Sequence, residues 1–278
     1  MNRLLLREQL IQFLNEDIGR GDRSTAALQG QKAAAVITAG EAGCFYGETI
    51  VRETALLLGW TVEHVLADGT GMDAGAAAAR ISGTAADLLA GERVLLNLLQ
   101  RLSGTATMTS RAVQQVEGMG VRITDTRKTT PGLRMLEKDA VRAGGGVSHR
   151  GGLDDVCMIK ENHIAAAGSI TRAVELIRET AGPLTAIEIE VETESELREA
   201  VSCRPDVIML DDCSHEEARR WIPIIPDGIR IERSGSITME TLRDAALPGI
   251  DFISIGALTH SAPALDLSMR ITMKEAVR

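Results

Sequence analysis

Ile187-Glu188-Ile189-Glu190-Val191 alternates apolar and acidic residues. In an extended strand, this period of two places Ile187, Ile189 and Val191 on one face and both carboxylates on the other. If helices cover the apolar face, the carboxylates point into the interior of a barrel. The alternative is an edge strand with a wet acidic face.

Short apolar segments of the same kind recur on both sides of this strand, separated by segments with helical character. We predict strands at 122–125, 156–160, 186–191, 207–210, 229–232 and 252–255, and helices at 133–144, 168–181, 193–202, 214–221 and 238–246. Such alternation indicates a parallel sheet, closed or nearly closed as a barrel. Six strands fit an incomplete barrel as well as a full one.

The N-terminal part has a different character. Residues 3–15 and 48–58 show helical patterns, 33–39 is strand-like, and glycines punctuate short apolar runs over 61–84. A strong helix at about 86–102 follows, and we expect a second helix after Gly104.

Composition narrows the function. The chain has 278 residues, enough for one large barrel or two domains, and a net charge of −9 that disfavours nucleic-acid or anionic-membrane surfaces. Residues 122–160 nevertheless hold eight Lys or Arg against five Asp or Glu, a local charge of +3. This segment suggests an anion site, although a solvated helix face with mixed charges is the plainer alternative.

The cysteines and the apolar segments of the sequence indicate where in the cell the protein is expected. The four cysteines form no CxxC pair, which is typical of a cytosolic protein with free thiols. The N-terminus is too charged for a signal peptide, and no run of about 18 apolar residues predicts a membrane helix. We therefore expect a cytoplasmic protein without a membrane partner.

Polar groups follow nearly every predicted strand, and the carboxyl ends of barrel strands build active sites. Arg127, Lys128, Arg150 and Lys160 are suited to binding an anion such as a phosphate or carboxylate. The alternative for these cations is a surface network of ion pairs.

The other strand ends carry acidic, glycine-rich and histidine groups. Glu190, joined by Asp211, is suited to holding Mg²⁺ or offsetting a cationic transition state. Glycine-rich turns can cradle phosphates, and they occur here at 144–146, at 234–236 and at Gly256. His149 and His163 each sit near a cation and are either hydrogen-bond donors or acid–base groups, or structural residues.

Three motifs carry a resemblance to a known family. They read Asp125-Thr126-Arg127-Lys128-Thr129-Thr130-Pro131-Gly132-Leu133-Arg134, Gly144-Gly145-Gly146-Val147-Ser148-His149-Arg150 and Met158-Ile159-Lys160-Glu161-Asn162-His163-Ile164. These segments resemble the quinolinate phosphoribosyltransferases, and the similarity extends from residues 16–22 to 256–260. The resemblance implies transfer of phosphoribosyl from phosphoribosyl pyrophosphate to quinolinate, giving nicotinate mononucleotide, pyrophosphate and CO₂ in NAD biosynthesis.

The resemblance also implies the architecture, which is the type II phosphoribosyltransferase fold. An N-terminal α/β sandwich over 1–104, joined by 266–278, would precede an incomplete parallel α/β barrel over 105–265. A homodimer or larger homo-oligomer is implied, with Mg²⁺ as cofactor and with Arg93 entering the neighbouring subunit's site.

Residue roles follow from the same resemblance. Quinolinate carboxylates would be bound by Arg127, His149, Arg150 and Lys160, with Thr126 and His163 nearby. Lys128 would lie between quinolinate and pyrophosphate, and Lys160 would assist departure of CO₂. Glu190 and Asp211 would serve the ribose and Mg²⁺, while Ser234, Gly235, Ser236 and Gly256 would hold the 5-phosphate.

Some positions depart from the family pattern: Ser236 replaces an expected Gly, Arg233 a small apolar residue, Asp212 and Ser148 each an Asn, and Asp139 a Tyr. A positive φ at Ser236 would cost on the order of 1 kcal/mol, and Arg233 would add a cation beside the phosphate site. Three alternatives stay open: a molybdenum-transport relative, a barrel lyase using Lys160 as a Schiff base, and a non-catalytic binding protein.

Overall fold

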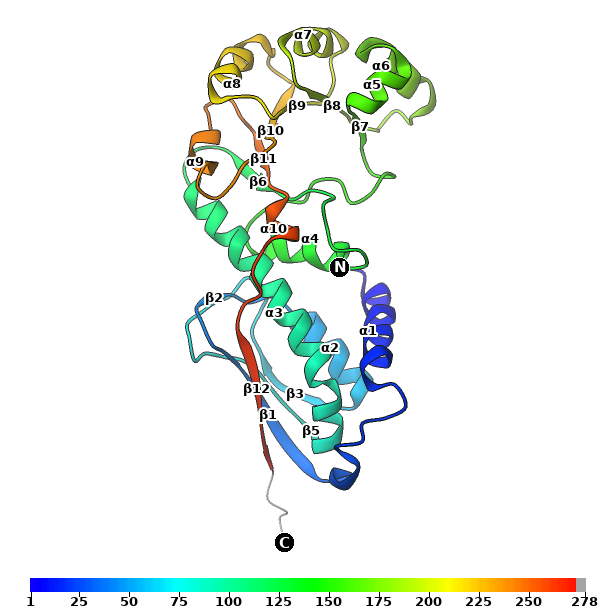
Figure 1. Ribbon diagram of the computed structural model, residues 1–278, viewed down its shortest axis with the longest axis vertical. Helices are drawn as coiled ribbons and strands as arrows, with labels where there is room; N and C mark the ends of the chain where they lie inside the picture. Colours follow the sequence, from blue (N-terminus) through cyan, green and yellow to red (C-terminus); the bar gives the residue numbers. More distant parts are fainter. Residues whose placement is uncertain (274–278) are drawn as a thin grey trace. The chain divides into compact units, whose positions relative to one another are not determined.

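The computed structural model describes residues 1–273, which form two compact units (Figure 1). The first comprises residues 1–110, 135–145 and the C-terminal segment from 262, and the second comprises residues 111–134 and 146–261. None of the helices within 1–273 has the length and apolar character needed to cross a membrane.

The first unit is built on an antiparallel sheet with the strand order β12-β1-β5-β3. Its elements are α1 (Arg3–Ile18), β1 (Lys32–Ala39), β2 (Gly43–Cys44), α2 (Glu48–Leu58), β3 (Thr61–Val65), β4 (Gly71–Met72), β5 (Ala77–Thr84), α3 (Ala85–Gln115), α4 (Arg134–Ala143) and β12 (Leu267–Met273). Strand β12 pairs with β1, so the C-terminal segment adds an edge strand to this sheet. Residues 274–278, which we also expected here, lie outside the described residues.

Helix α3 continues through the expected boundary at 104/105, and the two compact units divide at other positions. Gly104 does not end the helix. A Cβ atom there would lie 2.0 Å from the carbonyl oxygen of Pro263, so glycine permits a close backbone approach. Residues 135–145 also belong to the first unit, where Arg101 pairs with the fully buried Glu137 at 2.8 Å.

The second unit contains six parallel strands in the order β6-β11-β10-β9-β8-β7. Its elements are β6 (Arg122–Thr124), β7 (Cys157–Ile159), α5 (Glu161–Ala167), α6 (Ile170–Thr180), β8 (Ile187–Val191), α7 (Glu194–Cys203), β9 (Val207–Asp211), α8 (His215–Trp221), β10 (Arg230–Ser234), α9 (Leu242–Ala245), β11 (Phe252–Ser254) and α10 (Ala257–His260). In the described chain β6 and β7 are the two edges, which confirms the predicted incomplete barrel.

Helices α6, α7 and α8 cover the outer face of this sheet (Figure 1). Each begins at a side chain that accepts a backbone N–H, namely Ser169, Thr193 and Ser214. All five residues of β8 are buried, so its carboxylates lie in the barrel interior rather than on a wet edge. Helix α5 was missed, and the expected helix at 238–246 shrinks to α9.

Candidate active site

A cavity of about 430 Å³ lies at the carboxyl ends of the barrel strands. The predicted site residues that line it are Thr126, Arg127, Lys128, His149, Arg150, Lys160, Glu190, Asp211 and Ser234. The cavity is also lined by five residues that were not predicted as site residues: Arg134, Met158, Met209, Glu232 and Ser254. The strand ends therefore converge on a single pocket within the second unit.

Arg150 is the least exposed of the cations that line the pocket, with 8% of its surface exposed. Its Nη1 donates to the carbonyl of Val156 at 3.1 Å, and its Nη2 lies 3.5 Å from the sulfur of Met158. Burial and the neighbouring Arg127 lower the pKa of Arg150. The guanidinium stays charged all the same, and two neighbouring like charges favour an anion between them.

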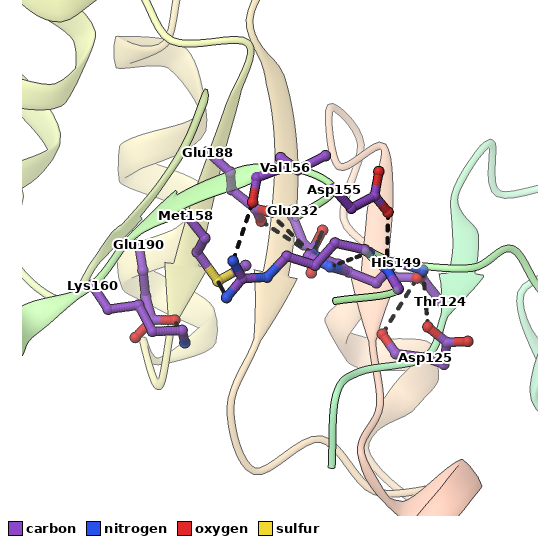
Figure 2. Close-up of polar contacts among 12 residues, drawn as sticks. Thr124, Asp125, His149, Asp155, Val156, Met158, Lys160, Glu188, Glu190 and Glu232 are labelled. Atoms are coloured by element: carbon purple, nitrogen blue, oxygen red, sulfur yellow. Dashed lines mark hydrogen bonds and ion pairs between the residues drawn. The ribbon is translucent and has the colours of Figure 1, made fainter. Parts of the chain in front are cut away.

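Lys160 and Glu190 form an ion pair across the pocket (Figure 2). Burial raises the pKa of Glu190, and Lys160 opposes that shift. Lys160 follows β7 and forms the N-cap of α5, so its side chain starts from a fixed backbone position. The pair still leaves further N–H donors on Lys160 and further lone pairs on Glu190 for a ligand.

A second acidic group lies beside this pair. Glu190, Glu192 and Asp211 each place a carboxylate oxygen within 4.8 Å of the others. Oxygen ligands of this kind suit Mg²⁺. Glu192 was not predicted, because its position after the buried strand reads as an ordinary exposed acid.

His149 is held on both ring nitrogens (Figure 2). Its Nδ1 accepts the backbone N–H of Arg150 at 2.8 Å, while its Nε2 lies 3.2 Å from Glu188 and 3.4 Å from Glu232. Burial opposes a charge on this ring, whereas the two carboxylates outweigh it and raise the pKa of His149 to about 10. A pKa of about 10 taken alone would charge the ring at neutral pH. An imidazolium, however, would direct a second N–H at the Arg150 N–H, so the 2.8 Å contact at Nδ1 requires the neutral Nε2–H tautomer despite the raised pKa.

Gly235 and Ser236 line a neighbouring cavity together with Arg233. Ser236 has φ +51°, so the expected positive φ is present, and its hydroxyl donates to Asp212 Oδ1 at 3.0 Å. Arg233 is buried and donates to the carbonyls of Ala245 and Cys213 at 3.3 and 3.4 Å. Its charge is therefore directed to backbone carbonyls.

Three other predicted residues are absent from the pocket lining. Gly256 lies close to it, since a Cβ atom there would be 3.1 Å from Cδ of Lys128. His163 accepts the N–H of Lys160 at 3.2 Å through Nδ1, which is a helix-capping contact. Arg93 is exposed on α3 in the first unit.

The glycines at 144–146 also lie outside the pocket lining. A Cβ atom at Gly144 would be 2.4 Å from the carbonyl oxygen of Ala106 and 2.7 Å from Cβ of Thr109. Gly144 is therefore required by packing against α3, not by a phosphate.

An open parallel α/β barrel whose strand ends present several cations beside a set of carboxylates defines an enzyme for a multiply anionic substrate. The models of the quinolinate phosphoribosyl transferase C-terminal and N-terminal domains match residues 105–270 and 22–103. The chain belongs to the quinolinate phosphoribosyltransferase family.

Relatives from distant organisms agree. The chain is 48% identical over 276 residues to a probable carboxylating nicotinate-nucleotide pyrophosphorylase of Bacillus subtilis, covering 98% of this chain and 96% of that protein. It is 35% identical to the human carboxylating nicotinate-nucleotide pyrophosphorylase, covering 87% and 83%. The crystal structure of NadC from Streptococcus pyogenes superposes with a TM-score of 0.93 at 39% identity, covering 99% of each chain.

Proposed function

We propose that this protein is a carboxylating nicotinate-nucleotide pyrophosphorylase, a pentosyltransferase of NAD biosynthesis. It joins quinolinate to the phosphoribosyl group of phosphoribosyl pyrophosphate and releases pyrophosphate and CO₂. The observation that carries this proposal is the pocket in which Arg127, Arg150 and Lys160 converge. A substrate with two carboxylates and a substrate with several phosphates both suit these cations.

The roles proposed here follow the family resemblance, and their support is that these side chains line one pocket. Arg127 and Arg150 bind the quinolinate carboxylates, and Lys128 lies between the ring and the departing pyrophosphate. Loss of pyrophosphate leaves cationic character on the ribose, which Glu190 and Asp211 stabilise. Departure of CO₂ leaves negative charge on the ring carbon next to nitrogen, which Lys160 offsets.

The 5-phosphate is assigned to the turns after β10 and β11. Ser234 lines the pocket, and Gly235, Ser236 and Gly256 lie on the backbone that follows these strands. Their N–H groups suit a phosphate, which is an expectation from turn geometry. Ser234→Ala removes the hydroxyl of the residue that lines the pocket, and a selectively raised KM for phosphoribosyl pyrophosphate is the expected result.

The assignment is tested by supplying quinolinate or nicotinate with phosphoribosyl pyrophosphate and Mg²⁺. Turnover with quinolinate and none with nicotinate is expected. Turnover with nicotinate alone would refute the carboxylating assignment.

Mg²⁺ is assigned to Glu190 and Asp211, with Glu192 nearby, and when bound it would neutralise pyrophosphate charge. Asp211→Asn should raise the Mg²⁺ concentration for half-maximal activity by about tenfold or more, since a lost charge-assisted contact costs about 1.5–3 kcal/mol. Titrating activity against Mg²⁺ measures the shift. The exposed Asp227→Asn is the matched control, and an equal requirement in both variants would remove Asp211 from the metal site.

We assign a homodimeric or larger assembly in which Arg93 reaches the neighbouring site. The support is that Arg93 is exposed although it projects from a well-buried helix. Arg93→Ala and Lys128→Ala should each be inactive alone. Mixing the two unfolded variants and refolding them together should restore part of the activity, whereas no restoration would count against a shared site.

A cytoplasmic location is assigned from the four cysteines, all of which are free thiols. Cell fractionation tests it, with activity in the membrane or secreted fraction as the contrary result.

A further inference from the structure

His149 carries more protein contacts than a ligand-binding histidine needs. Its backbone N–H donates to Asp125 Oδ1 at 2.9 Å, and Asp125 is fully buried at the end of β6. Both ring nitrogens are also occupied, by the N–H of Arg150 and by the carboxylates of Glu188 and Glu232. Neither nitrogen can reach a substrate carboxylate without giving up one of these contacts.

We propose that Asp125, Glu188 and Glu232 are positioning residues, which hold His149 as the Nε2–H tautomer so that the adjoining Arg150 is fixed in the pocket. His149 then acts through Arg150 and does not itself bind quinolinate. The inference rests on the proposed function, because Arg150 is assigned there to a quinolinate carboxylate.

The burial of the two acids supports a positioning role. Glu188 and Glu232 are each 3% exposed, and Glu232 lines a pocket that is meant for anions. A buried carboxylate without a hydrogen-bond donor lowers the free energy of unfolding, and its negative charge weakens the binding of an anion nearby. Two such groups are therefore expected to have hydrogen-bond donors. A carboxylate that accepts the N–H of an imidazole fixes the tautomer and the orientation of the ring, as it does for histidines in other active sites.

A metal is the competing occupant of this cluster. One atom each of His149, Glu188 and Glu232 lies within 4.8 Å of the others. A metal at Nε2 would need the lone pair of that nitrogen. The N–H of Arg150 already requires the lone pair of Nδ1, so the proton of the neutral ring belongs on Nε2. The geometry therefore favours a proton over a metal here.

The kinetic test compares Glu232→Leu with Glu232→Gln. The amide oxygen of glutamine still accepts the Nε2–H, so Glu232→Gln should stay near wild type. Glu232→Leu should raise KM for quinolinate by roughly ten- to a hundredfold, the scale of a misplaced binding group, with kcat within about threefold and KM for phosphoribosyl pyrophosphate unchanged. Glu175→Gln, on the exposed face of α6, is the control. Equal KM values for all variants would overturn the proposal.

The spectroscopic test is independent of turnover. The full-length protein is labelled with ¹⁵N-histidine, and Glu188→Gln and His149→Gln variants assign the His149 signals among five histidines. A protonated Nε2 and an unprotonated Nδ1, both unchanged when quinolinate saturates the protein, are expected at neutral pH. An Nδ1–H tautomer, an imidazolium, a Zn²⁺-induced shift, or a quinolinate-induced shift would each overturn the inference. A wild-type protein that does not bind quinolinate would instead refute the proposed function.

Discussion

Replacing Lys160 with methionine is expected to lower kcat with quinolinate by roughly two to three orders of magnitude, the usual loss when one charge-stabilising group is removed. Methionine keeps most of the apolar stem and removes only the charge. Lys160 is part-exposed, with 36% of its side chain accessible, so the loss should come from chemistry more than from folding.

The measurement is single-turnover release of CO₂ with both substrates saturating. Lys160→Met also leaves Glu190, at 6% exposure, without its cationic partner. Lys160→Arg keeps a cation beside Glu190 and so controls for that, and it should retain more of the rate than Lys160→Met if the charge at this position offsets the ring carbanion. Normal binding of both substrates with CO₂ released at the wild-type rate would remove Lys160 from this step.

Removing Arg3 and Arg7 together is expected to destabilise the first unit by about 1–3 kcal/mol, because the buried Glu53 carboxylate loses its hydrogen-bond donors. Glu53 is 1% exposed, and its carboxylate accepts from Arg3 at 2.9 Å and from Arg7 at 2.6 Å. Arg3 and Arg7 are 63% and 45% exposed, so their charges remain in contact with water when Glu53 is removed. Glu53→Met should therefore cost less than Arg3→Met/Arg7→Met.

Urea unfolding of the three variant proteins checks this asymmetry. The triple variant Arg3→Met/Arg7→Met/Glu53→Met should be more stable than the double arginine variant, and an equal or lower stability would contradict the reasoning. Acidity offers a second check. The hydrogen bond from Arg7 lowers the pKa of Glu53, so its contribution is complete above the unfolded carboxyl pKa of about 4.3 and is lost as the pH falls below it.

Repetitive patterns were readable from the sequence. Alternation in Ile187–Val191 and the spacing of similar strands predict the parallel barrel, because period and order depend on local residues. Cations at strand ends predict the pocket, since parallel strands bring their carboxyl ends to one edge. Arg127, Lys160 and Asp211 indeed line one cavity.

Other features depend on what a residue meets far along the chain. Gly104 looks like a helix break in the sequence, yet glycine is required there because the backbone of Pro263 packs against it. Gly144 is required in the same way by the backbone of Ala106. Glu232 reads as an ordinary strand residue before an arginine. Only the register of β10 beside β9 and β8 brings it to His149, and nothing in its neighbours signals that contact.

Quinolinate labelled with ¹⁴C in the carboxylate next to the ring nitrogen gives the most direct test of the proposed reaction. The purified protein is incubated with phosphoribosyl pyrophosphate and Mg²⁺, and labelled CO₂, pyrophosphate and nicotinate mononucleotide are quantified together. Equal amounts of all three, dependent on both substrates, are the predicted result. Pyrophosphate released without labelled CO₂, or no product from quinolinate, would contradict the account.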